Sequence, residues 1–209
     1  VVGEILSIDF EWVLDTRHGA DYFRRWHRRM ENCGGLLVHK ATHHFDLLNW
    51  WLEDDPEAVY AFGARRFYGP TRKNRGKRCL TCDFKKTCEF YWDITSNEFT
   101  KRFYYEAEKE DGYIRDGCVF SDEINIYDTM SVNVKYSKGA MLSYSLIAHS
   151  PYEGWRAAIN CVNGRIEAEE FHSGHRVDEP VQQIRVYNRK GEVVTYDIKK
   201  ATGVHGGGD

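Results

Sequence analysis

Residues 129–147 read Thr-Met-Ser-Val-Asn-Val-Lys-Tyr-Ser-Lys-Gly-Ala-Met-Leu-Ser-Tyr-Ser-Leu-Ile, and this stretch decides the fold. β-Branched, aromatic and other apolar residues alternate with polar ones on both sides of Ser137-Lys138-Gly139. Alternation with a period of two is typical of strands, and a short Gly-containing joint between two such runs is typical of a hairpin. The stretch therefore predicts two antiparallel strands.

The same pattern continues toward the C-terminus. Asn163-Gly164 joins two further runs, and Asn-Gly is the strongest short signal for a hairpin. Residues 182–188 and 192–198 form another pair around Lys190-Gly191. We therefore expect a large, mostly antiparallel sheet, followed by a flexible Gly-rich tail at 203–209.

The first half of the chain carries the predicted helices. The patterns favour a strand at 4–14, a helix at 36–52, a strand at 57–68 and a helix at 97–109. Because the helices gather in one half, they must cover one face of the sheet, which predicts an α+β fold. No Gly-x-Gly-x-x-Gly follows a strand, so we expect no Rossmann domain and no cofactor-binding residue within this chain.

Charge and composition exclude several classes of partner. The 209 residues include 29 basic and 32 acidic side chains, a net charge of −3 that favours neither nucleic acid nor anionic membranes. No apolar run approaches the roughly 20 residues of a membrane helix, and no signal peptide is recognisable. The start without Met indicates an excised segment. Six Cys do not form a secreted disulfide framework at this size, so we expect a cytoplasmic protein.

The predicted helix 36–52 carries the candidate chemistry. His39, His43, Asp46 and Trp50 follow one another at spacings of four, three and four, which places them on one helical face. Leu37, Ala41 and other apolar residues lie opposite. Two imidazoles beside a carboxylate suit acid–base catalysis near neutral pH. A solvated polar face and a zinc site built on the two His remain alternatives.

The pattern Gly34-Gly35-x3-His39-x2-Thr42-His43-x2-Asp46 resembles the family of glucose–fructose oxidoreductase, inositol dehydrogenase and MocA. Weaker matches continue along most of the chain, at Gly3-Glu4, at residues 128–139 and at residues 155–167. The resemblance implies that residues 1–202 form the substrate-binding and oligomerisation domain that follows a Rossmann domain. That cofactor domain, with its Glu-Lys-Pro motif, has no counterpart in this chain.

By the same resemblance His43 corresponds to the catalytic His, and Asp46 to a later, mainly structural Asp. His39 stands where the family usually has Asp, and both His are candidate catalytic residues. The resemblance implies NAD(P), a sugar or polyol substrate and a homo-oligomer formed through the sheet. Apolar neighbours such as Met141-Leu142 and Leu146-Ile147 also predict apolar side chains on both faces of the sheet.

Other side chains near this helix are candidate substrate ligands. Trp26 can form an apolar wall against a sugar ring, while Arg25 and His27 can bind hydroxyls or a carboxylate. Lys40 and Asp46 complete the set. A solvated basic loop around Trp26 and a snorkelling Lys40 are the structural alternatives.

A basic segment at 69–120 forms a predicted insertion. It contains Cys79, Cys82 and Cys88, and Cys118 follows. Four thiolates can hold zinc, although the spacing between the second and third Cys is unusual. Free thiols, disulfides and a nucleic-acid contact by this basic loop are the alternatives.

Three functions remain open from the sequence. The leading one is the substrate-binding and assembly domain of an NAD(P)-dependent oxidoreductase acting on a carbohydrate or polyol. The second is a domain of a redox-assisted glycosidase, which the replacement of Asp by His39 keeps open. The third is a non-catalytic binding or oligomerisation module.

Overall fold

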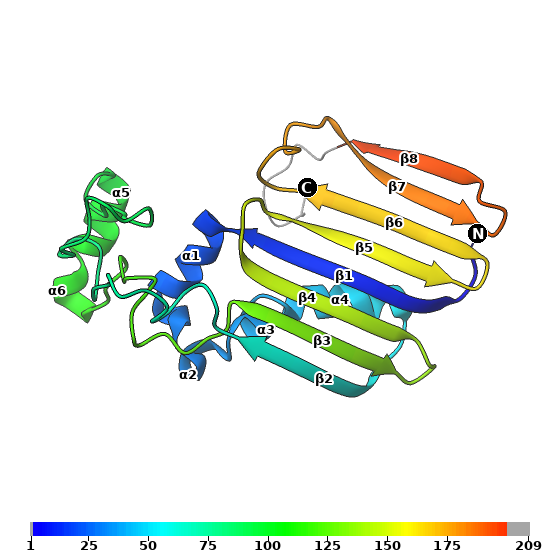
Figure 1. Ribbon diagram of the computed structural model, residues 1–209, viewed down its shortest axis with the longest axis horizontal. Coiled ribbons are helices and arrows are strands. Elements are labelled where there is room, and N and C mark those ends of the chain that lie inside the picture. Colours follow the sequence, from blue (N-terminus) through cyan, green and yellow to red (C-terminus); the bar gives the residue numbers. More distant parts are fainter. Residues whose placement is uncertain (1, 200–209) are drawn as a thin grey trace.

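Eight strands form one sheet in the computed structural model, which describes residues 2–199 (Figure 1). The strand order is β2-β3-β4-β1-β5-β6-β7-β8, and β1 and β4 are the parallel pair in this otherwise antiparallel sheet. The bounds are β1 (Ile5–Asp15), β2 (Pro56–Ala64), β3 (Thr129–Tyr136), β4 (Met141–Ser150), β5 (Gly154–Cys161), β6 (Gly164–Phe171), β7 (Val181–Asn188) and β8 (Val193–Lys199). The predicted large, mostly antiparallel open sheet is confirmed. The predicted tail at 203–209 lies outside the described residues.

Two groups of helices accompany the sheet. The first group, α1 (Thr16–Arg24), the 3₁₀ turn η1 (Trp26–Arg28), α2 (Met30–Cys33), α3 (Leu36–His39) and α4 (Thr42–Leu52), connects β1 to β2. In Figure 1, α3 and α4 lie behind the strands β1, β3 and β4, so helices cover one face of the sheet. The second group, α5 (Glu98–Thr100), the π-helical turn η2 (Lys101–Tyr105) and α6 (Glu108–Asp111), lies in a lobe beyond the end of the sheet.

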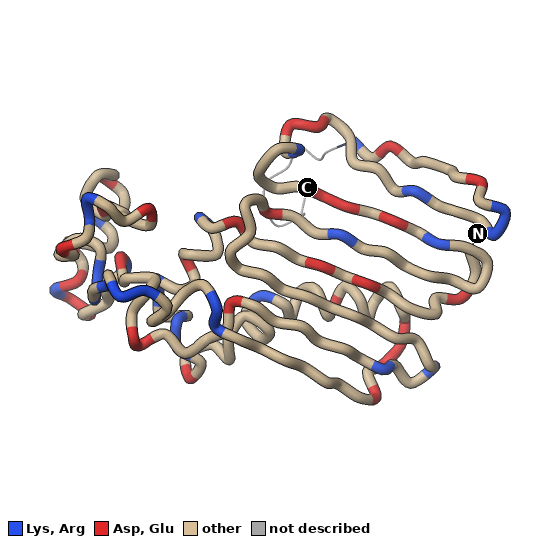
Figure 2. Tube along the Cα trace, in the orientation of Figure 1, with Lys and Arg blue, Asp and Glu red and all other residues tan. Residues whose placement is uncertain are grey.

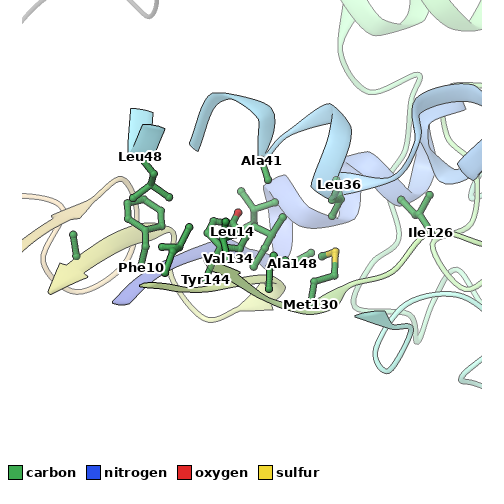
Figure 3. Close-up of a cluster of buried hydrophobic side chains, with 14 of the residues drawn as sticks. Phe10, Leu14, Leu36, Ala41, Leu48, Ile126, Met130, Val134, Tyr144 and Ala148 are labelled. Carbon is green, nitrogen blue, oxygen red and sulfur yellow. The ribbon is translucent and has the colours of Figure 1, made fainter. Parts of the chain in front are cut away.

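The core lies between the covered face of the sheet and the helices. Leu36, Ala41 and Leu48, from the helical segment 36–52, point toward the sheet strands that carry Phe10 and Tyr144 (Figure 3). All five side chains are at most 3% exposed. Burying a large apolar side chain contributes about 1.5–3 kcal/mol, so this contact holds the helices on the sheet.

The predicted helix 36–52 is interrupted after His39. The backbone N–H of Ala41 bonds to the carbonyl of Leu36, five residues earlier, at 2.9 Å, and the hydroxyl of Thr42 bonds to the carbonyl of Val38. The extra residue in this turn changes the helical phase of α4 relative to α3. His44 and Leu48 are the buried residues of α4, and Phe45 is partly buried against the same core.

Two other predicted elements differ from those in the structure. The strand expected at 57–68 stops at Ala64, because the next backbone N–H groups, from Arg66 to Tyr68, bond to the buried carboxylate of Asp128 instead of to a strand. The helix expected at 97–109 is broken into α5, η2 and α6.

The prediction that both faces of the sheet are apolar is wrong for β3. Met130, Val132 and Val134 are buried against the helices, whereas Ser131 and Asn133 are exposed on the open face. In β4 the side chains also alternate, and Met141 is exposed while Leu142 is buried. The prediction rested on apolar residues that are neighbours in the sequence, such as Met141 and Leu142, and Met141 lies at the exposed first position of β4. Figure 2 shows acidic and basic residues along β1, β5 and β6.

Among residues 2–199, no helix has the length and apolar character needed to cross a membrane.

Candidate functional site

The site is built around the C-terminal end of β1. Asp15 ends this strand and caps α1, because its carboxylate accepts hydrogen bonds from the backbone N–H groups of Arg17 (3.0 Å) and His18 (2.8 Å). Gly19 lets α1 lie directly on β4, since a Cβ at this position would come within 1.9 Å of the carbonyl oxygen of Ala148. The cap and the close approach together hold His18 beside the strand ends.

His18 contacts Glu153, which lies in the turn just before β5. The Nδ1 atom of His18 is 2.9 Å and 3.0 Å from the two carboxylate oxygens of Glu153. The Glu153 side chain is 12% exposed and that of His18 is 41% exposed. A buried carboxylate thus holds one side of a solvent-accessible imidazole.

A group of aromatic rings continues from His18. Its ring stacks on Tyr22 at a centroid distance of 5.4 Å, and Tyr22 meets His27 at 5.6 Å and His39 at 5.8 Å edge to face. His27 and His39 are 4.2 Å apart, and Trp26 stacks on His27 at 3.9 Å. The structure therefore brings together three predicted site residues, Trp26, His27 and His39.

The two clustered imidazoles are neutral near pH 7. Burial lowers the pKa of His27 to about 4, and the neighbouring His39 and Arg25 act in the same direction. Burial also lowers the pKa of His39, with additional repulsion from Arg25, His43 and Lys40. A neutral imidazole can accept a proton, which is the property that a general base requires.

Lys40 lies on the indole of Trp12, with its Nζ 4.9 Å from the ring centroid. Burial lowers the pKa of Lys40, although the Glu153 carboxylate acts in the opposite direction. The ring of His44 also stacks on the Trp12 indole, with the ring centroids 4.1 Å apart. The half-buried Lys40 thus makes a cation–π contact with Trp12, and its role as a substrate ligand stays a prediction.

The predicted row on α4 faces solvent. His43 and Asp46 are not buried, and Trp50 is 73% exposed. Within the described part of the chain, no hydrogen bond joins Asp46 to His43 or His39, so Asp46 does not fix either imidazole here. Repulsion from His43 also lowers the pKa of His39, and the side chains of both residues are exposed.

Arg25 is occupied within the protein. Its guanidinium lies 3.3 Å from the Asp21 carboxylate and interacts with the Tyr113 hydroxyl, which together raise its pKa against the effect of burial. Arg115 also pairs with Asp21. The Arg25 guanidinium is therefore engaged by Asp21 and is not free to bind a substrate carboxylate.

The four Cys of the insertion do not form the predicted zinc site. All are free thiols, and in the described range 2–199 no three His, Cys, Asp or Glu side chains are grouped so that they could hold a metal ion. The Cys79 thiol instead accepts a hydrogen bond from the buried guanidinium of Arg24 at 3.0 Å. Arg24 also donates to the carbonyls of Gly117 and Phe90, so this contact ties the lobe to α1.

Four residues of this site escaped the sequence analysis: Trp12, His18, Tyr22 and Glu153. His18 and Glu153 are separated by 135 positions, and their contact depends on β1 lying between β4 and β5. The arrangement offers apolar ring faces and imidazoles at the Trp26–His27–His39 cluster, and the Lys40 side chain on Trp12 nearby in the chain. Ring faces combined with a few convergent polar groups are suited to a small polar molecule with an apolar side, such as a sugar.

Comparison with known proteins identifies relatives of the chain. Residues 1–208 match the family described as oxidoreductase family, C-terminal alpha/beta domain (Gfo/Idh/MocA). The putative oxidoreductase YteT of Bacillus subtilis (strain 168) is 44% identical over 223 residues, which cover all of this chain and 52% of that protein. The chain therefore spans about half the length of this relative.

Solved structures share the fold at low sequence identity. Levoglucosan dehydrogenase in complex with NADH and levoglucosan has a TM-score of 0.54 at 13% identity, covering 96% of this chain and 41% of that one. Aldose-aldose oxidoreductase from Caulobacter crescentus complexed with glycerol has a TM-score of 0.53 at 9% identity, covering 97% and 42%. Given the match over nearly its whole length, the chain belongs to the C-terminal α/β domain family of the Gfo/Idh/MocA oxidoreductases.

Proposed function

We propose that this chain is the substrate-binding domain of an NAD(P)-dependent oxidoreductase that acts on a carbohydrate or polyol. The observation that carries the proposal is the stack of Trp26 on His27, with His39 at 4.2 Å from His27 and the exposed His43 four residues after His39. The indole provides an apolar surface for one face of a sugar ring. The imidazoles of His39 and His43 can take the proton of a substrate hydroxyl as that carbon is oxidised.

The cofactor would be held by a part of the protein outside this chain. A dinucleotide pyrophosphate usually rests on the N-terminus of a helix that follows a strand. Here the helix that follows β1 is capped by the Asp15 carboxylate, whose charge would repel a phosphate. The described residues thus do not fit the cofactor, and we propose that a Rossmann domain preceding residue 1 binds it. The isolated chain is then expected to be inactive.

We also propose that the protein forms a homo-oligomer through the open face of the sheet. This face has a hollow of about 530 Å³ lined by charged side chains that include Asp9, Glu11 and Arg156. Tyr60 and Phe62 are more than 60% exposed on β2, at the border of the same face. Mixed charge and exposed aromatic rings are common features of interfaces. Light scattering that shows only a monomer, even at tenfold higher concentration, would exclude this assembly.

The activity is tested on the full-length protein with NAD⁺ or NADP⁺ and a panel of free sugars, polyols and aryl glycosides. The proposal predicts net reduction of the cofactor by at least one sugar or polyol. Release of an aglycone without net NAD(P)H would identify the redox-assisted glycosidase instead. If the folded protein gives neither product, the chain is a binding or assembly module and the proposal fails.

A further inference from the structure

The contact between His18 and Glu153 has the geometry of a catalytic acid–base pair. We propose that His18 is a second proton-transferring residue of the site and that Glu153 is its positioning residue. The inference rests on the proposed function, because it assigns His18 a substrate hydroxyl in the same site. It concerns residues that lie outside the His39–His43 row.

The position of the imidazole hydrogen follows from the partner. Both Glu153 oxygens lie about 3 Å from Nδ1 of His18, and an ionised carboxylate can only accept hydrogen bonds. Nδ1 therefore carries the hydrogen, and the lone pair of the neutral ring is on Nε2. Within residues 2–199 no hydrogen bond occupies Nε2, and the side chain is 41% exposed. The basic nitrogen is the one that a substrate can reach.

Both members of the pair are held by one small network. The Ser173 hydroxyl accepts a hydrogen bond from the Glu153 backbone N–H at 2.9 Å and donates one to the Asp15 carboxylate at 2.7 Å. The other oxygen of Asp15 caps α1, the helix that carries His18. Asp15 thus links the backbone of both residues. Orientation of this kind is what a catalytic His needs from its supporting residues.

The pair borders an accessible hollow beside the ring cluster. This hollow, about 480 Å³ in volume, is lined by Asp15, Arg17, His18, Asp21, Glu153, His172 and Ser173. His18 stacks on Tyr22, whose ring also meets His39. Tyr22 therefore joins the hollow at His18 to the ring cluster that contains His39.

The proposed step is a simple proton transfer. The O–H bond of a substrate hydroxyl breaks, its electron pair stays on the oxygen, and a new N–H bond forms at Nε2 of His18. The Glu153 carboxylate stabilises the resulting imidazolium through the Nδ1–H hydrogen bond, as carboxylates do for catalytic His residues elsewhere. Reversal of the step protonates a substrate oxygen.

The kinetic test compares variants of the full-length protein with whichever panel sugar or polyol reduces the cofactor fastest. His18→Asn is expected to lower kcat about 10²-fold or more while KM changes little, since general acid–base catalysis contributes about 10²–10⁴-fold. Glu153→Gln, whose amide oxygen can still accept the Nδ1–H, should retain more activity than Glu153→Ala. His149→Asn is the control, because His149 stacks on Phe67 away from this hollow. Activity of His18→Asn within twofold of the wild type would overturn the proposal.

A second measurement needs no substrate. Diethylpyrocarbonate modifies unencumbered imidazole nitrogens, and peptide mass spectrometry reports each His separately. In the unliganded full-length protein, His18 is expected to react and the buried His44 to be protected, with slower reaction of His18 in Glu153→Ala. The exposed His175 shows that the reagent is active. An unreactive His18 beside a reactive His175 would overturn the proposal, even if no panel sugar is turned over and the proposed function itself fails.

Discussion

The Nδ1 atom of His44 lies 2.8 Å from the hydroxyl oxygen of Tyr144 inside the core. His44 is 5% exposed, and its ring stacks on Trp12, which forms part of the candidate site. Its neighbour in the chain, His43, faces solvent. Two consecutive imidazoles thus have separate roles, because one joins α4 to the sheet and the other remains available for chemistry.

Burial of His44 makes the stability of the protein depend on pH. Burial lowers the pKa of His44 from 6.5 to about 3, so the unfolded chain takes up a proton between these pH values that the folded chain does not. The free energy of unfolding should therefore decrease as the pH falls from about 6.5 toward 3. Thermal melts between pH 7 and pH 4 measure this slope. It should be shallower in His44→Asn and unchanged in His175→Asn, and equal slopes in His44→Asn and the wild type would contradict the expectation.

Gly19 controls the distance between α1 and the sheet. In Gly19→Ala the added Cβ would meet the carbonyl oxygen of Ala148 at 1.9 Å, so α1 must move away and carry His18 with it. We expect a loss of about 1–3 kcal/mol in stability, as for other overpacked sites, together with lower activity. Gly76→Ala is the control, because its Cβ would come no closer than 3.3 Å to the Cys82 sulfur. Chemical denaturation that gives the same stability for both variants would show that α1 is not held as described.

Trp26 is expected to act in substrate binding rather than in proton transfer. Its indole is 43% exposed while it stacks on His27, so one ring face is free for a sugar. Trp26→Ala should raise KM roughly tenfold and change kcat little, because aromatic stacking contributes about 0.5–1.5 kcal/mol. Phe99→Ala, on the lobe and 59% exposed, provides the comparison. A decrease in kcat without a change in KM would assign Trp26 a different role.

The parts of this fold that were predictable from sequence are those with local signals. Alternation around Lys138-Gly139 and the Asn163-Gly164 turn predict hairpins, because their strands are neighbours in the chain. The insertion of β1 between β4 and β5 has no such signal, since its partners follow more than 120 residues later. The contact between His18 and Glu153 depends on that insertion and was missed for the same reason.

Within the candidate site, the break in the helical segment after His39 was not predicted. His39 and His43 are both accessible at one end of the helical segment, as their spacing indicates. The helix is interrupted at Lys40, where the carbonyls of Leu36 and Val38 accept hydrogen bonds from the Ala41 N–H and the Thr42 hydroxyl. The periodicity of the sequence does not reveal these hydrogen bonds. His44 is buried against Tyr144 and Trp12, contacts that the sequence pattern does not predict. The zinc prediction failed because Cys79 packs against Arg24 rather than against the other thiols.

The most direct test of the proposed site is the rate of cofactor reduction in a single turnover by the full-length protein and its His43→Asn variant. The full-length protein, preloaded with NAD⁺ or NADP⁺, is mixed with the most active panel sugar or polyol, and NAD(P)H absorbance is followed. We expect a loss of about 10²-fold or more in His43→Asn at saturating substrate, with unchanged cofactor binding. A rate within twofold of the wild type would contradict the assignment of proton transfer to the imidazoles of His39 and His43.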